Sequence, residues 1–172
     1  FFHMIRRQLA LPFRKPCILM SPKSMLRSSV AVSPLSDFAE GTRFQETIGD
    51  TFVEPKKVKR VLLCSGKLYW ELAEKQQKDN RKDVAIIRIE QLHPFPKKQV
   101  EALLGQYKKA EVVWIQEEPE NMGYWSYILR EFPEIGLGKV IARKASASPA
   151  TGYMKIHAKE QAELIEQAFT LD

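Results

Sequence analysis

The chain has 172 residues, of which 44% are hydrophobic and 28% are charged, and its formal net charge is +6. This length and composition indicate a globular protein of about one domain, and no apolar run approaches the roughly 20 residues that cross a bilayer. Lys and Arg are interleaved with Asp and Glu along most of the sequence. The basic excess therefore does not by itself predict nucleic-acid binding.

The first residues have a helical pattern that places Phe2, Ile5 and Leu9 on one face. The chain opens inside this pattern, on Phe rather than Met. We therefore expect the end of a helix from a domain that precedes Phe1, and the sequence is expected to be a segment of a longer protein.

Short apolar runs rich in β-branched residues predict the strands of a sheet. They lie at Cys17–Met20, Val58–Cys64, Val84–Ile89, Val112–Ile115 and Val140–Ile141. Near-continuous apolar character is typical of strands that are buried on both faces, so we expect a mainly parallel, five-stranded sheet. Both cysteines of the chain fall inside these runs, which is typical of small core residues in a reducing compartment.

Amphipathic helical patterns alternate with the later strands. They cover Lys67–Lys78, Lys97–Lys109, Tyr124–Phe132 and Ala158–Phe169. Pro96 precedes the second helix and Pro133 stops the third, as expected for proline near a helix start and beyond a helix end. This alternation predicts an α/β fold with helices on both faces of the sheet.

The segment Ser28–Glu54 has weak periodicity and many turn residues. It predicts a connector over residues 28–57 that wraps a surface and ends in a hinge. The expected organisation is therefore a partial domain at 1–27, this connector, and a compact domain at 58–172.

The stretch "QEEPENMGYW" (116–125) follows a predicted buried strand directly. Glu117 and Glu118 lie at the carboxyl end of that strand, where open α/β sheets place their ligands. One interpretation is a carboxylate pair for acid–base chemistry. The other is a structural or interface corner, in which a turn leads to Asn121 as a helix cap. The corner is favoured because no partner of fitting chemistry stands nearby.

Other candidate sites are less specific. "LLCSGK" (62–67) lies at a strand-to-helix turn that could hold an anion, but it lacks the glycines of nucleotide-binding motifs and favours a plain tight turn. His3, His93 and His157 have no metal-ligand spacing. We expect His93 to be packed or capping and His157 to lie at a surface or interface. The small, polar run 143–157 suits an interface or a ligand-facing loop.

Several stretches, in order along the chain, resemble one family. They are "KPCILMSPKSMLR", "LSDFAEGTRFQ", "VLLCSGKLYWEL", "RIEQLHPFP", "QEEPENMGYW" and "ASASPATGYMKIHAKEQAELI". Together they are similar to the carboxyl-terminal portion of the thiamine-diphosphate-dependent decarboxylase of the 2-oxoglutarate dehydrogenase complex, from about Phe1 to Phe169. Ala142 and Lys144 depart from the Gly and Pro expected there, which affects the backbone of the following loop.

The resemblance implies a domain like the carboxyl-terminal domain of transketolase, with one reversed edge strand, after the last helix and strand of a pyrimidine-binding domain. It implies a homodimeric parent enzyme that decarboxylates 2-oxoglutarate with thiamine diphosphate and magnesium, and that succinylates a lipoyl group of the succinyltransferase component. The cofactor motif and active-site histidines would lie upstream of Phe1. Catalytic, cofactor-binding and metal-binding residues are therefore not expected in this segment, which would be inactive alone. The expected location is the bacterial cytoplasm, or the mitochondrial matrix in a eukaryote.

The resemblance also implies a position for the acidic corner. Glu117, Glu118 and Asn121 are expected on a loop that faces neighbouring domains of the same enzyme or the other subunit, near the active-site entrance at most.

Some relatives bind acetyl-CoA or AMP as effectors near the junction with this domain. The candidates for such a site here are basic: Arg6, Arg7, Lys23 and Arg27. A free-standing regulatory module that binds an anionic nucleotide is the alternative function. Nucleic-acid binding is disfavoured, because the interleaved aromatic and basic pattern of such surfaces is missing.

Overall fold

The computed structural model describes residues 1–171 and divides the chain into two compact units. The first unit comprises Phe1–Gln45, and the second begins at Glu46. This boundary falls inside the predicted connector 28–57, so part of that connector belongs to the second folded unit. The assignment of residues 1–27 to a pyrimidine-binding domain stays a prediction.

The first unit begins with α1, which spans Phe2–Ala10 and confirms the predicted helix. Two short 3-10 helices follow at Met25–Arg27 and Leu35–Phe38. Phe2 packs edge-on against Phe38, with ring centroids 5.2 Å apart. The start of α1 is thus held against the second 3-10 helix by an aromatic contact.

The strand predicted at Cys17–Met20 does not form. Ile18 and Met20 are 82% and 92% exposed, so the run is not part of a core. A strand needs a neighbouring strand for its ladder and a surface to bury its side chains, and the apolar run alone supplies neither. Cys17 is exposed and Cys64 is buried. The prediction of core cysteines is therefore right for Cys64 and wrong for Cys17.

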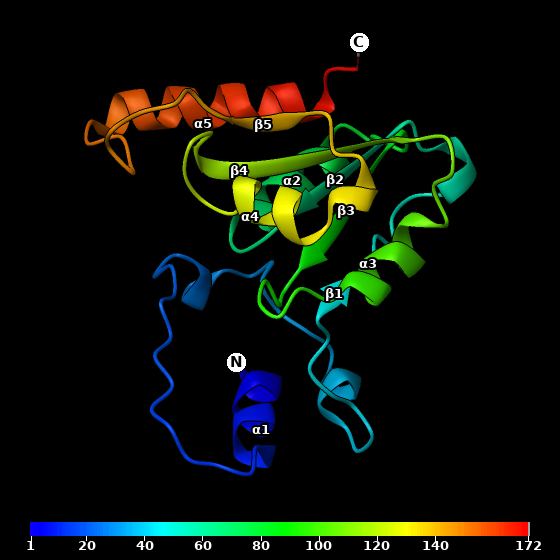
Figure 1. Ribbon diagram of the computed structural model, residues 1–172, viewed down its shortest axis with the longest axis vertical. Helices are drawn as coiled ribbons and strands as arrows, with labels where there is room; N and C mark the ends of the chain where they lie inside the picture. Colours follow the sequence, from blue (N-terminus) through cyan, green and yellow to red (C-terminus); the bar gives the residue numbers. More distant parts are fainter. Residues whose placement is uncertain (172) are drawn as a thin grey trace. The chain divides into compact units, whose positions relative to one another are not determined.

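The second unit is built on a five-stranded sheet in the order β1-β3-β2-β4-β5 (Figure 1). The strands are β1 (Thr47–Ile48), β2 (Arg60–Cys64), β3 (Val84–Ile89), β4 (Glu111–Pro119) and β5 (Val140–Arg143). β2 to β5 run parallel, and β1 pairs antiparallel with β3 at one edge. The expected mainly parallel sheet with one reversed edge strand is confirmed. Its fifth strand is β1, from the predicted connector.

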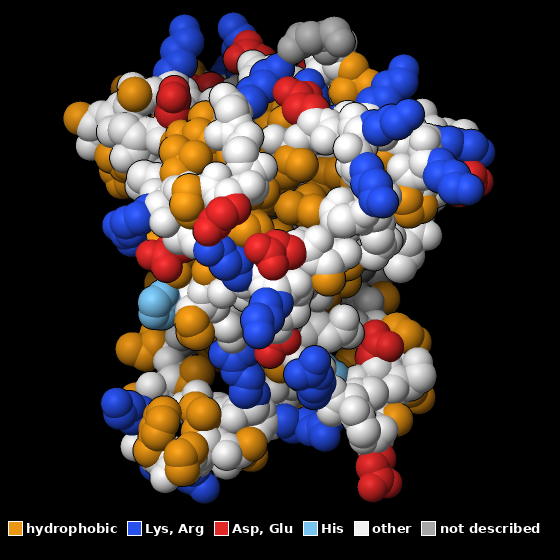
Figure 2. All heavy atoms as spheres, turned by 45° about the vertical axis from the view of Figure 1, so that its right-hand side comes forward, with side chains coloured by type: hydrophobic (Ala, Val, Ile, Leu, Met, Phe, Trp, Pro, Cys, Tyr) orange, Lys and Arg blue, Asp and Glu red, His pale blue; other side chains and the backbone are white. Residues whose placement is uncertain are grey.

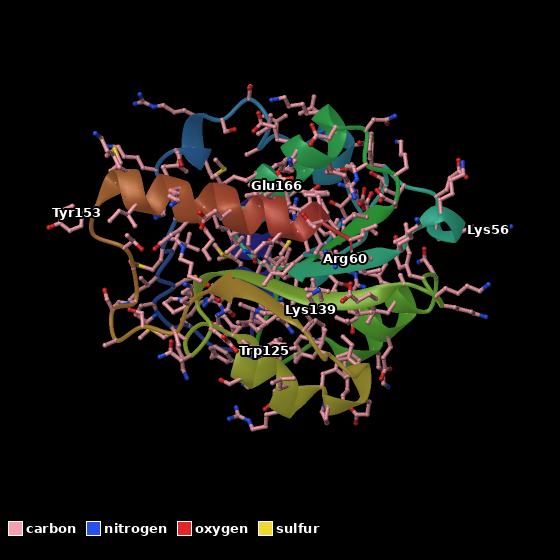
Figure 3. All side chains as sticks on the ribbon, turned by 90° about the horizontal axis from the view of Figure 1, so that it is seen from above. Lys56, Arg60, Trp125, Lys139, Tyr153 and Glu166 are labelled. Carbon is pink, nitrogen blue, oxygen red and sulfur yellow. The ribbon has the colours of Figure 1, made fainter. Side chains whose placement is uncertain are left out.

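Helices cover both faces of this sheet. They are α2 (Leu68–Lys78), α3 (Lys97–Leu104), α4 (Trp125–Glu131) and α5 (Met154–Phe169), with 3-10 turns at Pro55–Lys57 and Pro133–Ile135. Residues of α2 and α5 share one buried cluster with the sheet, and residues of α3 and α4 share the other. Figure 3 shows α5 and α4 on opposite sides of the strands. Within residues 1–171, no helix is long and apolar enough to cross a membrane.

Two helix boundaries differ from the predicted ones by more than one residue. α3 ends at Leu104, because Gly105 and the turns after it replace the last predicted helical residues. α5 begins at Met154, before the predicted Ala158, since Tyr153 is extended and the backbone of His157 already bonds to its carbonyl.

Strand alternation decides which polar side chains reach which helical layer. In β4, Trp114 belongs to the α3/α4 cluster and Ile115 to the α2/α5 cluster. Successive side chains point to opposite faces, so Gln116 lies on the α4 side and Glu117 on the α5 side. Charged side chains elsewhere are mixed in sign, and on the face drawn in Figure 2 blue and red side chains are interspersed.

Candidate functional site

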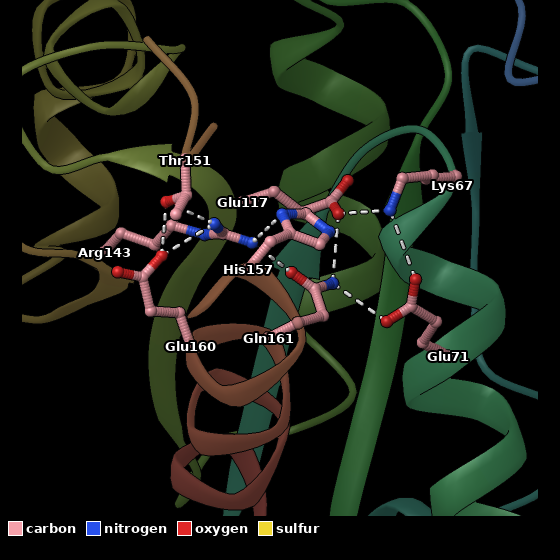
Figure 4. Close-up of polar contacts among 8 residues, drawn as sticks. All are labelled: Lys67, Glu71, Glu117, Arg143, Thr151, His157, Glu160 and Gln161. Atoms are coloured by element: carbon pink, nitrogen blue, oxygen red, sulfur yellow. Dashed lines mark hydrogen bonds and ion pairs between the residues drawn. The ribbon is translucent and has the colours of Figure 1, made fainter. Parts of the chain in front are cut away.

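A polar network lies at the carboxyl ends of three neighbouring strands (Figure 4). Lys67 follows β2, Glu117 lies near the end of β4, and Arg143 ends β5. Since β2, β4 and β5 are adjacent and parallel, their carboxyl ends meet at one edge of the sheet. The first half of α5 covers that edge. It is the position where open α/β folds place ligands.

Lys67 lies between two carboxylates. Its ammonium group forms ion pairs with Glu117 and with Glu71 of α2, the latter at 3.2 Å. Burial disfavours the charged ammonium, but the hydrogen bonds and charges of both carboxylates outweigh it and raise the pKa of Lys67 above its ordinary value. Lys67 therefore stays protonated at neutral pH and does not act as a base.

Gln161 of α5 joins the two halves of the network. Its Nε2 donates to Glu71 at 2.8 Å and to Glu117 at 3.0 Å, while its Oε1 accepts from Arg143 at 2.8 Å. Its side chain is buried. A buried amide is stable only when it is hydrogen-bonded, and this one uses both its donor and its acceptor.

Arg143 is the centre of the second half, and its side chain is only 8% exposed. Nη1 donates to Glu160 at 2.9 Å and to Thr151 at 3.2 Å, and Nη2 also lies 3.1 Å from Nδ1 of His157. Because a guanidinium only donates, Nδ1 of His157 is the acceptor and carries no proton. His157, expected at a surface or interface, is half-buried in this network.

Gln116 organises the acidic corner from the other face of β4. Its Oε1 accepts from the indole of Trp114 at 2.8 Å and from the backbone N–H of Trp125 at 3.1 Å. Its Nε2 donates to the carbonyls of Pro119 and Met122 at 3.0 and 2.7 Å. One buried amide thus fixes the turn between β4 and α4.

The predicted corner residues have separate roles. Asn121 exchanges two hydrogen bonds with the backbone of Ser146, so it fastens the loop 144–152 and does not cap α4. The prediction of a helix cap is therefore wrong. Glu117 belongs to the network with Lys67, whereas the side chain of Glu118 is exposed. The structure does not bring Glu117, Glu118 and Asn121 together as one site.

The loop fastened by Asn121 borders a cleft of about 670 Å³ against α5. The loop contributes small residues, and the helix contributes Ile156, Lys159 and Glu163. Arg143 lines the inner wall. The expectation that this run faces an interface or a ligand stays a prediction.

The four basic residues predicted for an effector lie in the first unit. Arg6 stacks over the ring of Phe2 and donates to the hydroxyl of Thr42, and Arg7 stacks over Phe44. The side chains of Lys23 and Arg27 are exposed. Their joint role as an effector site stays a prediction.

The remaining candidates are structural. Nδ1 of His93 lies 2.8 Å from the hydroxyl of Tyr127. Gly66 makes the turn after β2 with a φ of 67°. Burial raises the pKa of the Cys64 thiol to about 12, so it is no nucleophile. In the described part of the chain, no three His, Cys, Asp or Glu side chains are placed to hold a metal ion.

Sequence reasoning missed Lys67, Gln161, Arg143 and Gln116. Lys67 and Arg143 did carry a usable signal, because both lie at or just after the carboxyl end of a predicted strand. Gln161 and Gln116 had only the weaker signal of an amide within an apolar pattern.

The family described as "2-oxoglutarate dehydrogenase C-terminal" matches residues 32–169. The chain is 48% identical to the 2-oxoglutarate dehydrogenase E1 component of Haemophilus influenzae, covering 98% of this chain and 19% of that protein. It is 46% identical to the 2-oxoglutarate dehydrogenase E1 component of Cupriavidus necator, covering 98% of this chain and 18% of that protein. The chain thus spans about a fifth of the length of these relatives.

Among solved structures, the chain is similar to a split-gene transketolase described as an inactive beta4 tetramer. The TM-score is 0.51 at 13% sequence identity, over 78% of this chain and 45% of that one. At this identity the likeness concerns the fold, which agrees with the mainly parallel sheet and its two helical layers. Because the family match covers most of the sequence, the chain belongs to the 2-oxoglutarate dehydrogenase C-terminal family.

Proposed function

We propose that this chain is the carboxyl-terminal part of an E1 component that decarboxylates 2-oxoglutarate and transfers the succinyl group to the lipoyl group of a succinyltransferase component. The observation that carries the proposal is the family match over residues 32–169, together with relatives named as E1 components. The parent would be a homodimer in the bacterial cytoplasm or the mitochondrial matrix.

Such an enzyme would use thiamine diphosphate as its electron sink, with magnesium to hold the diphosphate. The residues of this chain do not fit a magnesium site. The carboxylates at the carboxyl edge, Glu71 and Glu117, are paired with Lys67 and Gln161, and within residues 1–171 no cluster of three metal ligands exists. We derive no step of the reaction through these groups, and we assign the cofactor to other parts of the parent enzyme.

The role of this region in the parent would be to organise the dimer and to shape the entrance of the active site. The network supports that role, because its charged groups pair with one another, and Nε of Arg143 is its one buried nitrogen without a hydrogen-bond partner. Lys67 has two carboxylate partners, and Arg143 donates to side chains from α5 and from the loop 144–152. Groups held in mutual hydrogen bonds position loops well, but they offer little to a substrate.

The direct test uses the full-length enzyme that contains this chain. Reduction of ferricyanide is measured with 2-oxoglutarate, thiamine diphosphate and magnesium, and pyruvate serves as the control substrate. We expect turnover that depends on 2-oxoglutarate. Turnover with pyruvate alone, or with neither acid, would contradict the proposed activity.

The regulatory alternative rests on the basic side chains of the first unit. Acetyl-CoA or AMP would bind at Arg6, Arg7, Lys23 and Arg27, since guanidinium groups hold phosphate through paired hydrogen bonds. Calorimetry on the full-length enzyme tests this, with Arg27→Ala expected to weaken binding and Arg130→Ala, an exposed arginine of α4, as the matched control. If neither nucleotide gives heat, or if Arg27→Ala leaves the affinity unchanged, these residues are ordinary surface charge.

A further inference from the structure

The outer face of α5 carries an unusual order of charges. Lys155 and Lys159 lie in its first half, and Glu163 and Glu166 lie in its second half. All four side chains are exposed. At 3.6 residues per turn they form one stripe, on the opposite side from the buried Leu164 and Ala168. The stripe is therefore basic at one end and acidic at the other.

This order opposes the helix dipole. Anions stabilise the start of a helix and cations stabilise its end, yet the first turn of α5 has no acidic residue and its last turn has no basic one. The pair Lys159–Glu163, with N and O atoms 3.8 Å apart, also has the less favourable direction, with the base before the acid. The stripe therefore destabilises α5 when the helix is considered by itself. A sequence that breaks local rules of this kind does so most often for function.

A second α5 laid antiparallel on this face would reverse the cost. Consider a two-fold axis that crosses the helix pair at the level of Glu160 and Gln161. Lys155 then comes opposite the second copy's Glu166. Lys159 comes opposite the second copy's Glu163, within one residue of the same register, or about 1.5 Å along the helix. Each basic half then meets an acidic half, and the two dipoles oppose each other. A parallel arrangement would place like charges together.

The start and the middle of the helix are also open to solvent. Tyr153 and Met154 are 77% and 85% exposed, and Figure 3 shows Tyr153 at the opposite end of α5 from Glu166. Tyr153 precedes the helix and Met154 lies about a quarter turn round it from Lys155, so neither belongs to the stripe itself. Midway, Ala158 and Ala162 line a groove of about 570 Å³ between α5 and α2, so short side chains allow a close approach.

We propose that α5 is an interface between two copies of this chain, formed by antiparallel pairing of the stripe Lys155, Lys159, Glu163 and Glu166 about a two-fold axis. The present partners of the stripe do not prevent it. Glu166 contacts Lys75 at 2.9 Å but is 70% exposed, and exposed ion pairs of this kind are weak. The inference rests on the dimer-organising role proposed above and gives it a location. Self-complementarity is the property that a two-fold interface requires.

Two charge-reversal variants test the interface. Lys155→Glu/Lys159→Glu makes the stripe wholly acidic, and Glu163→Lys/Glu166→Lys makes it wholly basic. Sedimentation velocity of the 172-residue chain is measured between about 1 and 200 µM. We expect the unchanged chain to dimerise, and each variant alone to weaken the dimer at least about tenfold. An equimolar mixture of the two should restore a dimer, because the acidic stripe then faces the basic one.

Lys108→Glu/Lys109→Glu is the matched control, since it makes the same change of charge at exposed lysines outside α5. It should leave the dimer unchanged, and circular dichroism should confirm that all variants are folded. A chain that stays monomeric overturns the proposal. That result is expected if another protein, or more of a longer polypeptide, covers this face. The proposal is also overturned if both variants still dimerise, or if mixing the two variants does not restore the dimer. The readout is mass alone, so a failure here is distinct from a failure of the decarboxylase assay.

Discussion

The side chain of Asn121 pairs with the backbone of Ser146 in the way that the backbones of two neighbouring strands pair. The side-chain amide of Asn121 donates to the carbonyl of Ser146, and its oxygen accepts from the backbone N–H of Ser146, both at 3.0 Å. Residues 25 positions apart in the sequence are thus joined by two bonds that mimic a ladder. The acidic corner noticed in the sequence acts through this amide, because it ties the turn after β4 to the loop after β5.

Asn121→Ala should therefore release the loop 144–152. We expect a loss of about 1–2 kcal/mol in the free energy of unfolding, because two hydrogen bonds disappear at an exposed site. Urea unfolding measures the loss, and hydrogen exchange should show a less protected Ser146 amide. Asn121→Asp keeps the acceptor for that amide and should lose less protection. Glu118→Gln is the control, and an equal effect from it would refute the pairing.

The sheet was predictable because its central strands are buried on both faces. Their apolar runs are nearly continuous, and β2, β3 and β4 are found where those runs lie. β1 has two residues and no such run, since it only extends the edge of β3. Cys17–Met20 is an apolar run too, but within residues 1–171 no strand pairs with it. Local sequence cannot tell an apolar run that finds a partner strand from one that does not.

The candidate site was predictable only in part. Glu117 could be found because it follows a buried strand, and ligand crevices lie at such ends. Its contacts with Lys67, Arg143 and Gln161 could not, since these side chains meet only through the strand order and the position of α5. Long-range arrangements of this kind leave no periodic signal in the sequence.

Arg60 should be the most sensitive polar residue of the second unit. Its side chain is 1% exposed and donates to Glu111, and Nη1 donates to the carbonyls of residues 167, 168 and 170 at the end of α5. Arg60→Met would remove the guanidinium hydrogen bonds to these carbonyls and lower the free energy of unfolding by about 3 kcal/mol. Chemical denaturation measures the change, with Lys59→Met, at an exposed neighbour, as the control. An Arg60→Met variant as stable as the unchanged chain would mean that apolar packing replaces the cap.

The 172-residue chain alone should not decarboxylate 2-oxoglutarate. At its carboxyl edge, Lys67 forms ion pairs with Glu71 and Glu117, so these three groups are engaged with one another. A ferricyanide-coupled assay with thiamine diphosphate and magnesium should give the same rate as the blank, while the full-length enzyme provides the positive control. Turnover by the chain itself would place chemistry within these residues.

The pH dependence of stability should reveal Lys67. Its carboxylate partners raise its pKa in the folded chain above the ordinary value of 10.5. A group whose pKa is higher when folded adds stability that is fully present below the unfolded pKa and is lost as the pH rises through the folded pKa. The free energy of unfolding should therefore fall as the pH is raised beyond the ordinary lysine range.

Lys67→Met isolates this contribution, because it keeps the aliphatic stem and removes the charge. The difference in stability between the unchanged chain and Lys67→Met should be constant below the ordinary lysine pKa and should shrink above it. Lys75 also has a raised pKa, caused first by its hydrogen bond to Glu166, so Lys75→Met is measured in parallel. Urea unfolding from neutral to strongly alkaline pH provides the comparison. A difference that stays constant over the whole range would show that Lys67 has no electrostatic role in holding β2, α2 and β4 together.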